Sequence, residues 1–130
     1  MGRTVLAVDD EAHAREFVST VLEENGYTPI VAKNGEEAMA TIRLKKPDLV
    51  IMDVLMPKQS GIRMYRELKT SESLKDIPVI IYSALARRTL LQAQAALTKT
   101  SGESVPNPDA HLEKPVTPER LLAAVRRILG

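Results

Sequence analysis

The sequence predicts an α/β fold in which a parallel five-stranded sheet is covered by helices on both faces. Short apolar runs alternate five times with segments of helical periodicity, and the central run is apolar at every position. Strands of this kind are typical of parallel sheets buried on both faces. A repeated strand–helix order calls for right-handed crossovers. No linker or repeat divides the 130 residues, so we expect a single domain, residues 1–130.

The first strand–helix unit is predicted at residues 4–8 and 12–25. The helical segment carries an apolar stripe formed by Phe17, Val18, Val21 and Leu22. Asn25 and Gly26 then supply a typical C-terminal stop for the helix, since these residues tolerate the left-handed conformation found there.

The second unit is predicted to be a strand at residues 28–32 and a helix that starts after Asn34. Pro29 lacks an N–H for the sheet ladder, which favours an edge position for this strand. Asn34 and Glu37 have the spacing of a capping box at a helix start. The central strand, residues 49–52, then leads directly to Asp53.

The third helix is predicted after Gly61, with inward residues Ile62, Met64, Tyr65 and Leu68. The fourth strand, residues 78–82, is again apolar and ends at Ser83. An Ala-rich helix is expected next, with one face formed by Ala86, Leu90, Ala93 and Leu97.

The end of the chain is predicted to hold a loop, a short strand and a last helix. Residues 100–108 have no helix or strand pattern. The strand at residues 110–113 ends at Lys114. Thr117 can cap the last helix, and Pro118 then takes the first-turn position that proline favours. The apolar face of that helix is formed by Leu121, Leu122, Val125, Ile128 and Leu129.

Composition narrows the classes of function. A formal net charge of +1 gives no electrostatic case for binding nucleic acid or an anionic membrane. The absence of cysteine excludes disulfides, thiol chemistry and Cys-ligated zinc. No apolar run approaches the roughly 18 residues of a membrane span, and the N-terminus does not resemble a signal peptide. We therefore expect a cytoplasmic protein.

Polar side chains follow four of the predicted strands at their carboxyl ends: Asp9, Asp10, Asp53, Ser83 and Lys114. In a parallel sheet these ends share one edge, which is where such sheets bind ligands. Three carboxylates within about 4–6 Å would repel one another by several kcal/mol. A hard divalent cation removes that cost, and Mg²⁺ suits a set of oxygen ligands.

The remaining groups at this edge suit phosphoryl chemistry. The Ser83 hydroxyl and the Lys114 ammonium are donors for the oxygens of a phosphoryl group. Asp53 is then left as the nucleophile, which would form an aspartyl phosphate.

In chain order, these residues resemble the receiver domain of two-component response regulators. The resemblance extends over residues 4–129 and is carried by Val8-Asp9-Asp10-Glu11, Asp53-Val54-Leu55-Met56-Pro57 with Gly61, Ser83-Ala84 and Lys114-Pro115. It implies a flavodoxin-like three-layer sandwich with strand order 2-1-3-4-5. It also implies that Asp53 accepts phosphate from a sensor histidine kinase or a phosphotransfer protein.

The resemblance also implies a role for each site residue. Asp10 and Asp53 would ligate Mg²⁺ directly, together with the main-chain carbonyl of Leu55, and Asp9 would position the metal through water. Ser83 would bond the phosphoryl oxygen and Lys114 would neutralise it. In the family, movement of the hydroxyl residue and of an aromatic on the fifth strand remodels the face of the fourth helix, fifth strand and fifth helix for an output protein.

The chain departs from the family in three places. His111 occupies the position of the switch aromatic, although an imidazole can also rotate. The span from Ser83 to Lys114 is longer than usual, which alters the output face. Leu55 and Leu85 occupy positions where polar residues often help to place the hydrolytic water, so we hypothesise a comparatively long-lived phosphoryl group.

Other interpretations of the same residues are weaker. Asp9 and Asp10 alone would suit a solvated turn or a helix cap, and His111 suits a structural strand residue better than a proton carrier. His111 is not expected to bind metal, because His13, the only other histidine, lies on the first predicted helix. The pairs Arg87-Arg88 and Arg126-Arg127 are expected to be solvated, with partner contact as the alternative.

Two further classes of function compete with a phosphorylated switch. A receiver-like protein-binding module that is never phosphorylated remains the alternative. A haloacid-dehalogenase-type phosphatase needs a second Asp where Leu55 stands, and a Rossmann site needs a Gly-rich turn after the first strand. We therefore expect no turnover enzyme. Because nothing follows Gly130, we expect a stand-alone switch that acts on an unknown output protein or in a relay.

Overall fold

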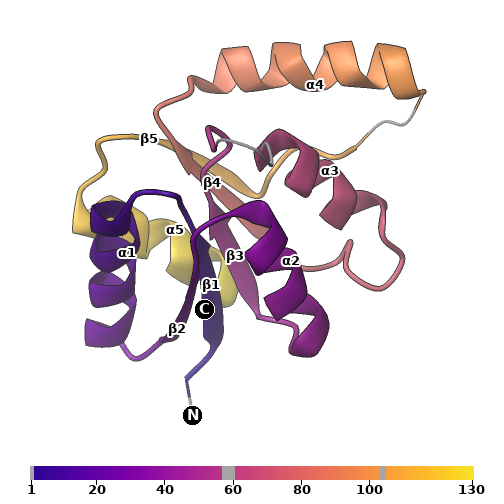
Figure 1. The fold of residues 1–130 in the computed structure, drawn as a ribbon. Helices are drawn as coiled ribbons and strands as arrows, with labels where there is room; N and C mark the ends of the chain where they lie inside the picture. The colour runs from indigo at the N-terminus through magenta and orange to yellow at the C-terminus, as the bar shows by residue number, and fades with distance from the viewer. Residues whose placement is uncertain (1, 57–60, 103–104) are drawn as a thin grey trace.

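The computed structural model describes residues 2–56, 61–102 and 105–130. Within them, strands and helices alternate along the chain as β1 (Thr4–Val8), α1 (Ala12–Glu24), β2 (Thr28–Ala32), α2 (Gly35–Leu44), β3 (Leu49–Met52), α3 (Gly61–Thr70), β4 (Val79–Ser83), α4 (Arg87–Ser101), β5 (Ala110–Glu113) and α5 (Pro118–Leu129). All neighbouring strands are parallel, in the order β2-β1-β3-β4-β5 (Figure 1). The flavodoxin-like fold predicted from the sequence is confirmed.

The sheet is the middle of three layers. Helices α1 and α5 cover one face, and α2 and α3 cover the other (Figure 1). Side chains on a strand alternate between the two faces of the sheet. On β3, Leu49 and Ile51 accordingly pack with α1 and α5, while Val50 and Met52 pack on the opposite side. This double burial explains why the central strand is apolar at every position.

Helices α2 and α5 begin at the capping residues predicted from the sequence. The side-chain oxygen Oδ1 of Asn34 accepts a hydrogen bond from the Glu37 N–H at 2.7 Å, and Glu37 Oε1 accepts one from the Lys33 N–H at 3.1 Å. Thr117 Oγ1 accepts from the Arg120 N–H at 3.2 Å, with Pro118 at the first helical position. The bonds from the Glu37 and Arg120 N–H groups satisfy donors that a helix leaves unpaired at its start, and the bond from the Lys33 N–H fixes the residue before the cap.

The structure confirms the predicted position of one strand and corrects the predicted end of one helix. The expected edge position of the strand containing Pro29 is confirmed, because β2 ends the sheet. The expected loop at residues 100–108 starts too early, because α4 continues to Ser101 and ends at Gly102, whose φ is +78°. Glycine adopts this left-handed conformation without steric cost, so it provides the stop that loop composition alone did not reveal. Pro57, to which the resemblance also extends, lies outside the described residues.

Helix α4 is held more lightly than the other helices. Among its described side chains only Leu90 is buried, and Ala93 is half-buried. Ala86, predicted on the same face, is instead the N-cap residue that precedes the helix. Arg66 Nη1 of α3 donates a hydrogen bond to Gln94 Oε1 at 3.1 Å. Few buried apolar contacts make an element easy to displace. In the described part of the chain, no helix is long and apolar enough to cross a membrane.

Gly61 lets the start of α3 lie directly against the segment that leaves β3. A Cβ at this position would overlap the carbonyl oxygen of Asp53 and the Cα of Val54. Both atoms belong to the backbone and cannot move aside as a flexible side chain can. Gly61 is therefore required because of a close approach of two backbones next to Asp53.

We expect Gly61→Ala to destabilise the fold by about 1–3 kcal/mol, the usual cost of overpacking, and to shift the backbone around Asp53. Urea unfolding gives the first quantity, and the amide NMR signals of Asp53 and Val54 give the second. Gly102→Ala is the matched control, since a Cβ there meets open space and only the positive φ opposes it. Equal amide shifts in the two variants would contradict the close-approach argument.

Candidate functional site

The sheet itself brings the predicted site residues to one edge. The Asp9 N–H donates to the Ala32 carbonyl at 3.1 Å, and the Asp53 N–H donates to the Val8 carbonyl at 3.0 Å. The Lys114 N–H likewise donates to the Ser83 carbonyl at 2.9 Å. Each bond continues the hydrogen-bond ladder just beyond a strand end. The backbones that carry these side chains are therefore as fixed as the strands.

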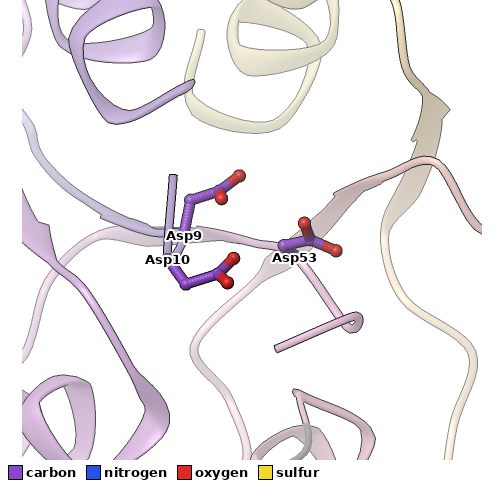
Figure 2. A group of neighbouring side chains, drawn as sticks. All are labelled: Asp9, Asp10 and Asp53. Atoms are coloured by element: carbon purple, nitrogen blue, oxygen red, sulfur yellow. The ribbon is translucent and has the colours of Figure 1, made fainter. Parts of the chain in front are cut away.

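Three carboxylates gather at this edge. One oxygen each from Asp9, Asp10 and Asp53 lies within 4.8 Å of the others, and Figure 2 shows the three side chains grouped beside the ends of β1 and β3. Asp9 and Asp53 are 4% and 6% exposed, whereas Asp10 is exposed to solvent. An all-oxygen donor set that is open on one side fits a hard divalent cation that keeps several waters. The cluster therefore suits a metal such as Mg²⁺.

The charge of Asp9 is costly where it stands. Burial raises the pKa of its carboxyl, and this effect exceeds the lowering by the hydrogen bonds from Lys114 and from the Glu11 N–H. The Glu11 N–H donates to Asp9 Oδ1 at 2.9 Å. Burial disfavours the charged form of a carboxyl group, and an approaching cation favours it. The charged form of Asp9 is therefore disfavoured in the folded protein when no cation is bound beside it.

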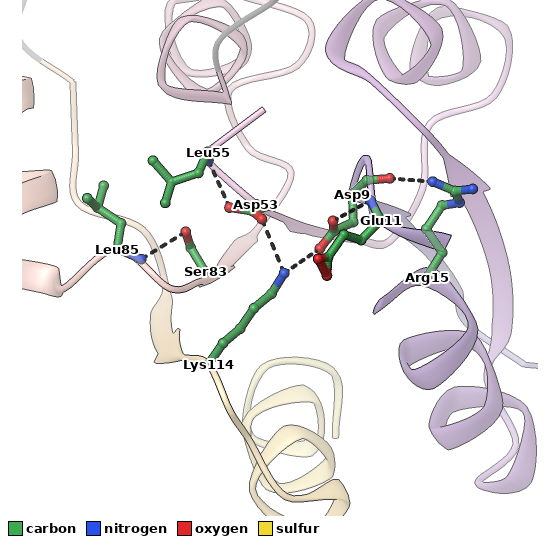
Figure 3. Close-up of polar contacts among 8 residues, drawn as sticks. All are labelled: Asp9, Glu11, Arg15, Asp53, Leu55, Ser83, Leu85 and Lys114. Carbon is green, nitrogen blue, oxygen red and sulfur yellow. Dashed lines mark hydrogen bonds and ion pairs between the residues drawn. The ribbon is translucent and has the colours of Figure 1, made fainter. Parts of the chain in front are cut away.

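Lys114 is the cation that spans the cluster. Its Nζ lies 2.7 Å from Asp9 Oδ2 and 3.2 Å from Asp53 Oδ2 (Figure 3). Burial lowers the pKa of Lys114, but the hydrogen bonds and the attraction of Asp9 and Asp53 together outweigh burial and raise it. The ammonium therefore stays charged at neutral pH. Among the residues that the structure describes, one cation faces two buried carboxylates, so negative charge is in excess there.

Main-chain N–H groups orient the other two predicted side chains. Asp53 Oδ1 accepts from the Leu55 N–H at 2.8 Å, so both oxygens of this carboxylate have a partner (Figure 3). The fully buried Ser83 hydroxyl accepts from the Leu85 N–H at 3.1 Å. Ser83 lies at the end of β4, next to β3 in the sheet. Leu55 is 50% exposed beside Asp53, and Leu85 is half-buried.

His111 lies away from the carboxylates, in the middle of β5. Its Nε2 is 2.8 Å from the Leu85 carbonyl oxygen. A carbonyl only accepts, so Nε2 carries the proton, and Nδ1 is left buried with no partner among the described residues. The imidazole therefore ties β5 to the segment between β4 and α4. Its predicted role as the switch residue stays a prediction.

Sequence reasoning missed two residues that contact this site. Arg15 Nη1 donates to the Asp9 carbonyl oxygen at 2.7 Å. The ring centroid of Tyr82 is 4.9 Å from Lys114 Nζ. Arg15 follows Glu11 by about one helical turn, a spacing that could have indicated a side chain over the start of α1. No sequence signal reveals the contact between Tyr82 and Lys114, because it joins two strands.

Comparisons with known proteins agree with this geometry. The family model described as the response regulator receiver domain matches residues 5–126. The chain is 36% identical over 129 residues to the phosphate regulon transcriptional regulatory protein PhoB of Pseudomonas aeruginosa, covering 99% of this chain and 52% of PhoB. It is 35% identical to the probable transcriptional regulator ycf27 of Pyropia yezoensis, covering 96% of this chain and 46% of that protein. The chain thus spans about half the length of these relatives.

Solved structures give the same result. The chemotaxis response regulator CheY4 of Vibrio cholerae superimposes with a TM-score of 0.82 at 28% identity, covering 98% of this chain and 99% of CheY4. The signal receiver domain of a signal transduction histidine kinase from Syntrophus aciditrophicus superimposes with a TM-score of 0.81 at 32% identity. That match covers 98% of this chain and 90% of the other.

The raised pKa of Asp9 predicts a pH dependence of stability in the absence of divalent metal. The folded state binds this proton more tightly than the unfolded state does, so the contribution of Asp9 to stability is full below 3.8, its ordinary value. It is lost as the pH rises through the higher folded pKa. In EDTA, the free energy of unfolding of the wild type should therefore fall with rising pH relative to Asp9→Asn, by about 1.4 kcal/mol for each unit of pKa shift.

Urea unfolding of both proteins between pH 4 and pH 7 measures this difference. Parallel pH profiles would show that the Asp9 charge carries no cost in the folded state. Addition of Mg²⁺ at pH 7 should stabilise the wild type more than the variant, because a bound cation relieves the cost only where the carboxylate is present.

Proposed function

The chain belongs to the response regulator receiver domain family, and we propose that residues 1–130 work as a phosphorylation-dependent signalling switch with Asp53 as the phosphoacceptor. The observation that carries this proposal is the buried Asp53 carboxylate, held 3.2 Å from Lys114 Nζ within 4.8 Å of the two other acids. A sensor histidine kinase or a phosphotransfer protein would be the donor. The proposal places the chain in the cytoplasm, where such a kinase has access to ATP.

In the proposed reaction, a carboxylate oxygen of Asp53 attacks the phosphorus of a phosphohistidine. The new P–O bond forms as the P–N bond breaks, and the histidine nitrogen leaves with the electron pair and takes a proton. Hydrogen bonds to both oxygens of Asp53 hold the nucleophile in one orientation, which supports an in-line approach. The chain would modify itself and dephosphorylate slowly, and it would not turn over as an enzyme.

Asp10, Asp53 and the main-chain carbonyl of Leu55 are the proposed direct ligands of Mg²⁺, with Asp9 acting through water. When bound, Mg²⁺ supplies positive charge for the phosphoryl oxygens. Lys114 would exchange its bond to Asp53 Oδ2 for one to a phosphoryl oxygen while it keeps Asp9. Ser83 would release the Leu85 N–H and turn its hydroxyl to another phosphoryl oxygen.

Movement at Ser83 would reach the face formed by α4, β5 and α5. Leu85 connects both ends of this path, because its N–H is bonded to Ser83 and its carbonyl to His111. His111 lines a pocket of about 470 Å³ on this face, together with Arg87, Arg120 and Arg127. These arginines are exposed and outnumber Asp109, the acid in the lining, so the pocket suits an acidic segment of an output protein or output domain. The light anchoring of α4 would allow it to shift.

The proposal predicts that acetyl phosphate adds one phosphoryl group to the protein only when Mg²⁺ is present. Intact-mass spectrometry after incubation measures the gain, and Asp53→Ala should abolish it. Asp76→Ala removes an exposed carboxylate outside the site and should leave the gain unchanged. In the phosphorylated protein, NMR amide signals on the α4, β5 and α5 face should move more than those of α2. No gain of mass under any condition would instead favour a binding module that is never phosphorylated.

We also expect the phosphoryl group to persist for minutes or longer. The side chains of Leu55 and Leu85 offer no hydrogen bond to an attacking water. Leu55→Asn should shorten the half-life roughly tenfold, equivalent to about 1.4 kcal/mol of activation free energy. Leu44→Asn is the matched control, because Leu44 is 90% exposed and lies at the end of α2. A wild-type half-life of seconds, without a phosphatase, would contradict the role of the leucines.

A further inference from the structure

Lys114 has a third neighbour besides the two carboxylates. The face of a neutral aromatic ring attracts a cation within about 6 Å of the ring centroid, and Tyr82 lies within that range at 4.9 Å. Tyr82 precedes Ser83 on β4, and its side chain is 7% exposed. The same strand thus supplies the site hydroxyl and, on the neighbouring residue, a ring against the site cation.

The ring of Tyr82 is held in place by its surroundings. It packs in the apolar cluster between the sheet and helices α1 and α5. The Phe17 ring of α1 lies against it, with 6.4 Å between ring centroids and an interplanar angle of 34°. This centroid separation lies within the range of favourable aromatic pairs. The ring therefore presents a fixed surface to Lys114.

A ring suits this place better than another polar partner would. Three carboxylates already crowd the edge, and a fourth would add repulsion toward an incoming phosphoryl group. A carbonyl or hydroxyl partner would compete with the phosphoryl oxygens for the three ammonium protons. The ring attracts the cation through its quadrupole, carries no net charge and uses no ammonium proton in a conventional hydrogen bond.

We propose that Tyr82 is a positioning residue for Lys114, whose ring keeps the ammonium beside Asp53 while its proton donors pass from carboxylate to phosphoryl oxygen. The contact between Tyr82 and Lys114 stands on the geometry alone, and its consequence for phosphorylation rests on the proposed function. Without the ring, Lys114 would sample more orientations toward solvent. The bond to the transferred group would then form less often.

The test compares Tyr82→Leu with Tyr82→Phe. Phenylalanine keeps the ring and leucine removes it, so Tyr82→Phe should behave as the wild type. The initial rate of phosphorylation by acetyl phosphate with saturating Mg²⁺ should fall about three- to tenfold in Tyr82→Leu, the size of one cation–π contact. Equal losses in both variants would overturn the role of the ring.

A double-mutant cycle separates positioning of Lys114 from general packing. Lys114→Met keeps the length of the side chain and removes the charge. In that background, Tyr82→Leu should cause no further loss of rate, because there is no ammonium left to position. An equal loss with and without Lys114 would show that Tyr82 only supports the core, and would overturn the proposal.

The same four proteins give an arm that needs no phosphorylation. In urea unfolding, Tyr82→Leu should lower the midpoint more in the wild-type background than in the Lys114→Met background, because only the former loses a cation–π contact. If the wild type is never phosphorylated, the proposed function fails while this coupling can still be present. Additive midpoint shifts would overturn the contact itself, whatever the outcome of the phosphorylation experiment.

Discussion

The parallel sheet gathers like charges at the carboxyl ends of its strands, and this repulsion is the constraint that the rest of the site answers. β1 and β3 are neighbours, so the residues that follow them, Asp9 and Asp53, are brought together by the backbone ladder itself. Within residues 2–56, 61–102 and 105–130, Lys114 is the one cation paired with both buried carboxylates. Burial strengthens every charge interaction at this edge, favourable or not. The site therefore carries excess negative charge, which a divalent cation can neutralise.

This imbalance is compatible with folding because the rest of the molecule is apolar and regular. The two clusters on either side of the sheet bury strands that are hydrophobic at every core position. Their burial supplies the main favourable free energy, against which a few costly charges are tolerated. The helices do not share this stability equally. α4, with Leu90 as its only buried side chain among those described, is the helix least bound to the core. The apolar contacts that stabilise the sheet are thus concentrated away from α4.

One main-chain residue, Leu85, is hydrogen-bonded both to Ser83 and to His111. Leu85 donates to Ser83 and accepts from His111, so the hydroxyl at the site and the imidazole on β5 share a connecting segment. Both contacts are hydrogen bonds to peptide groups, which fix distance and direction. The imidazole of His111 can donate to the Leu85 carbonyl, which the phenyl ring of a phenylalanine could not do.

The sequence by itself determined the order of strands and helices, the capped helix starts at Asn34 and Thr117, and the edge on which Asp9, Asp53, Ser83 and Lys114 meet. Those features follow from periodicity, local hydrogen bonding and the geometry of parallel strands, which short stretches of chain encode. Only the tertiary structure decided that Tyr82 lies against Lys114, that His111 bonds to Leu85, and that Gly61 packs on the backbone of Asp53. These contacts join residues far apart in sequence or depend on close backbone approach, and no periodic pattern records the distance between two folded surfaces.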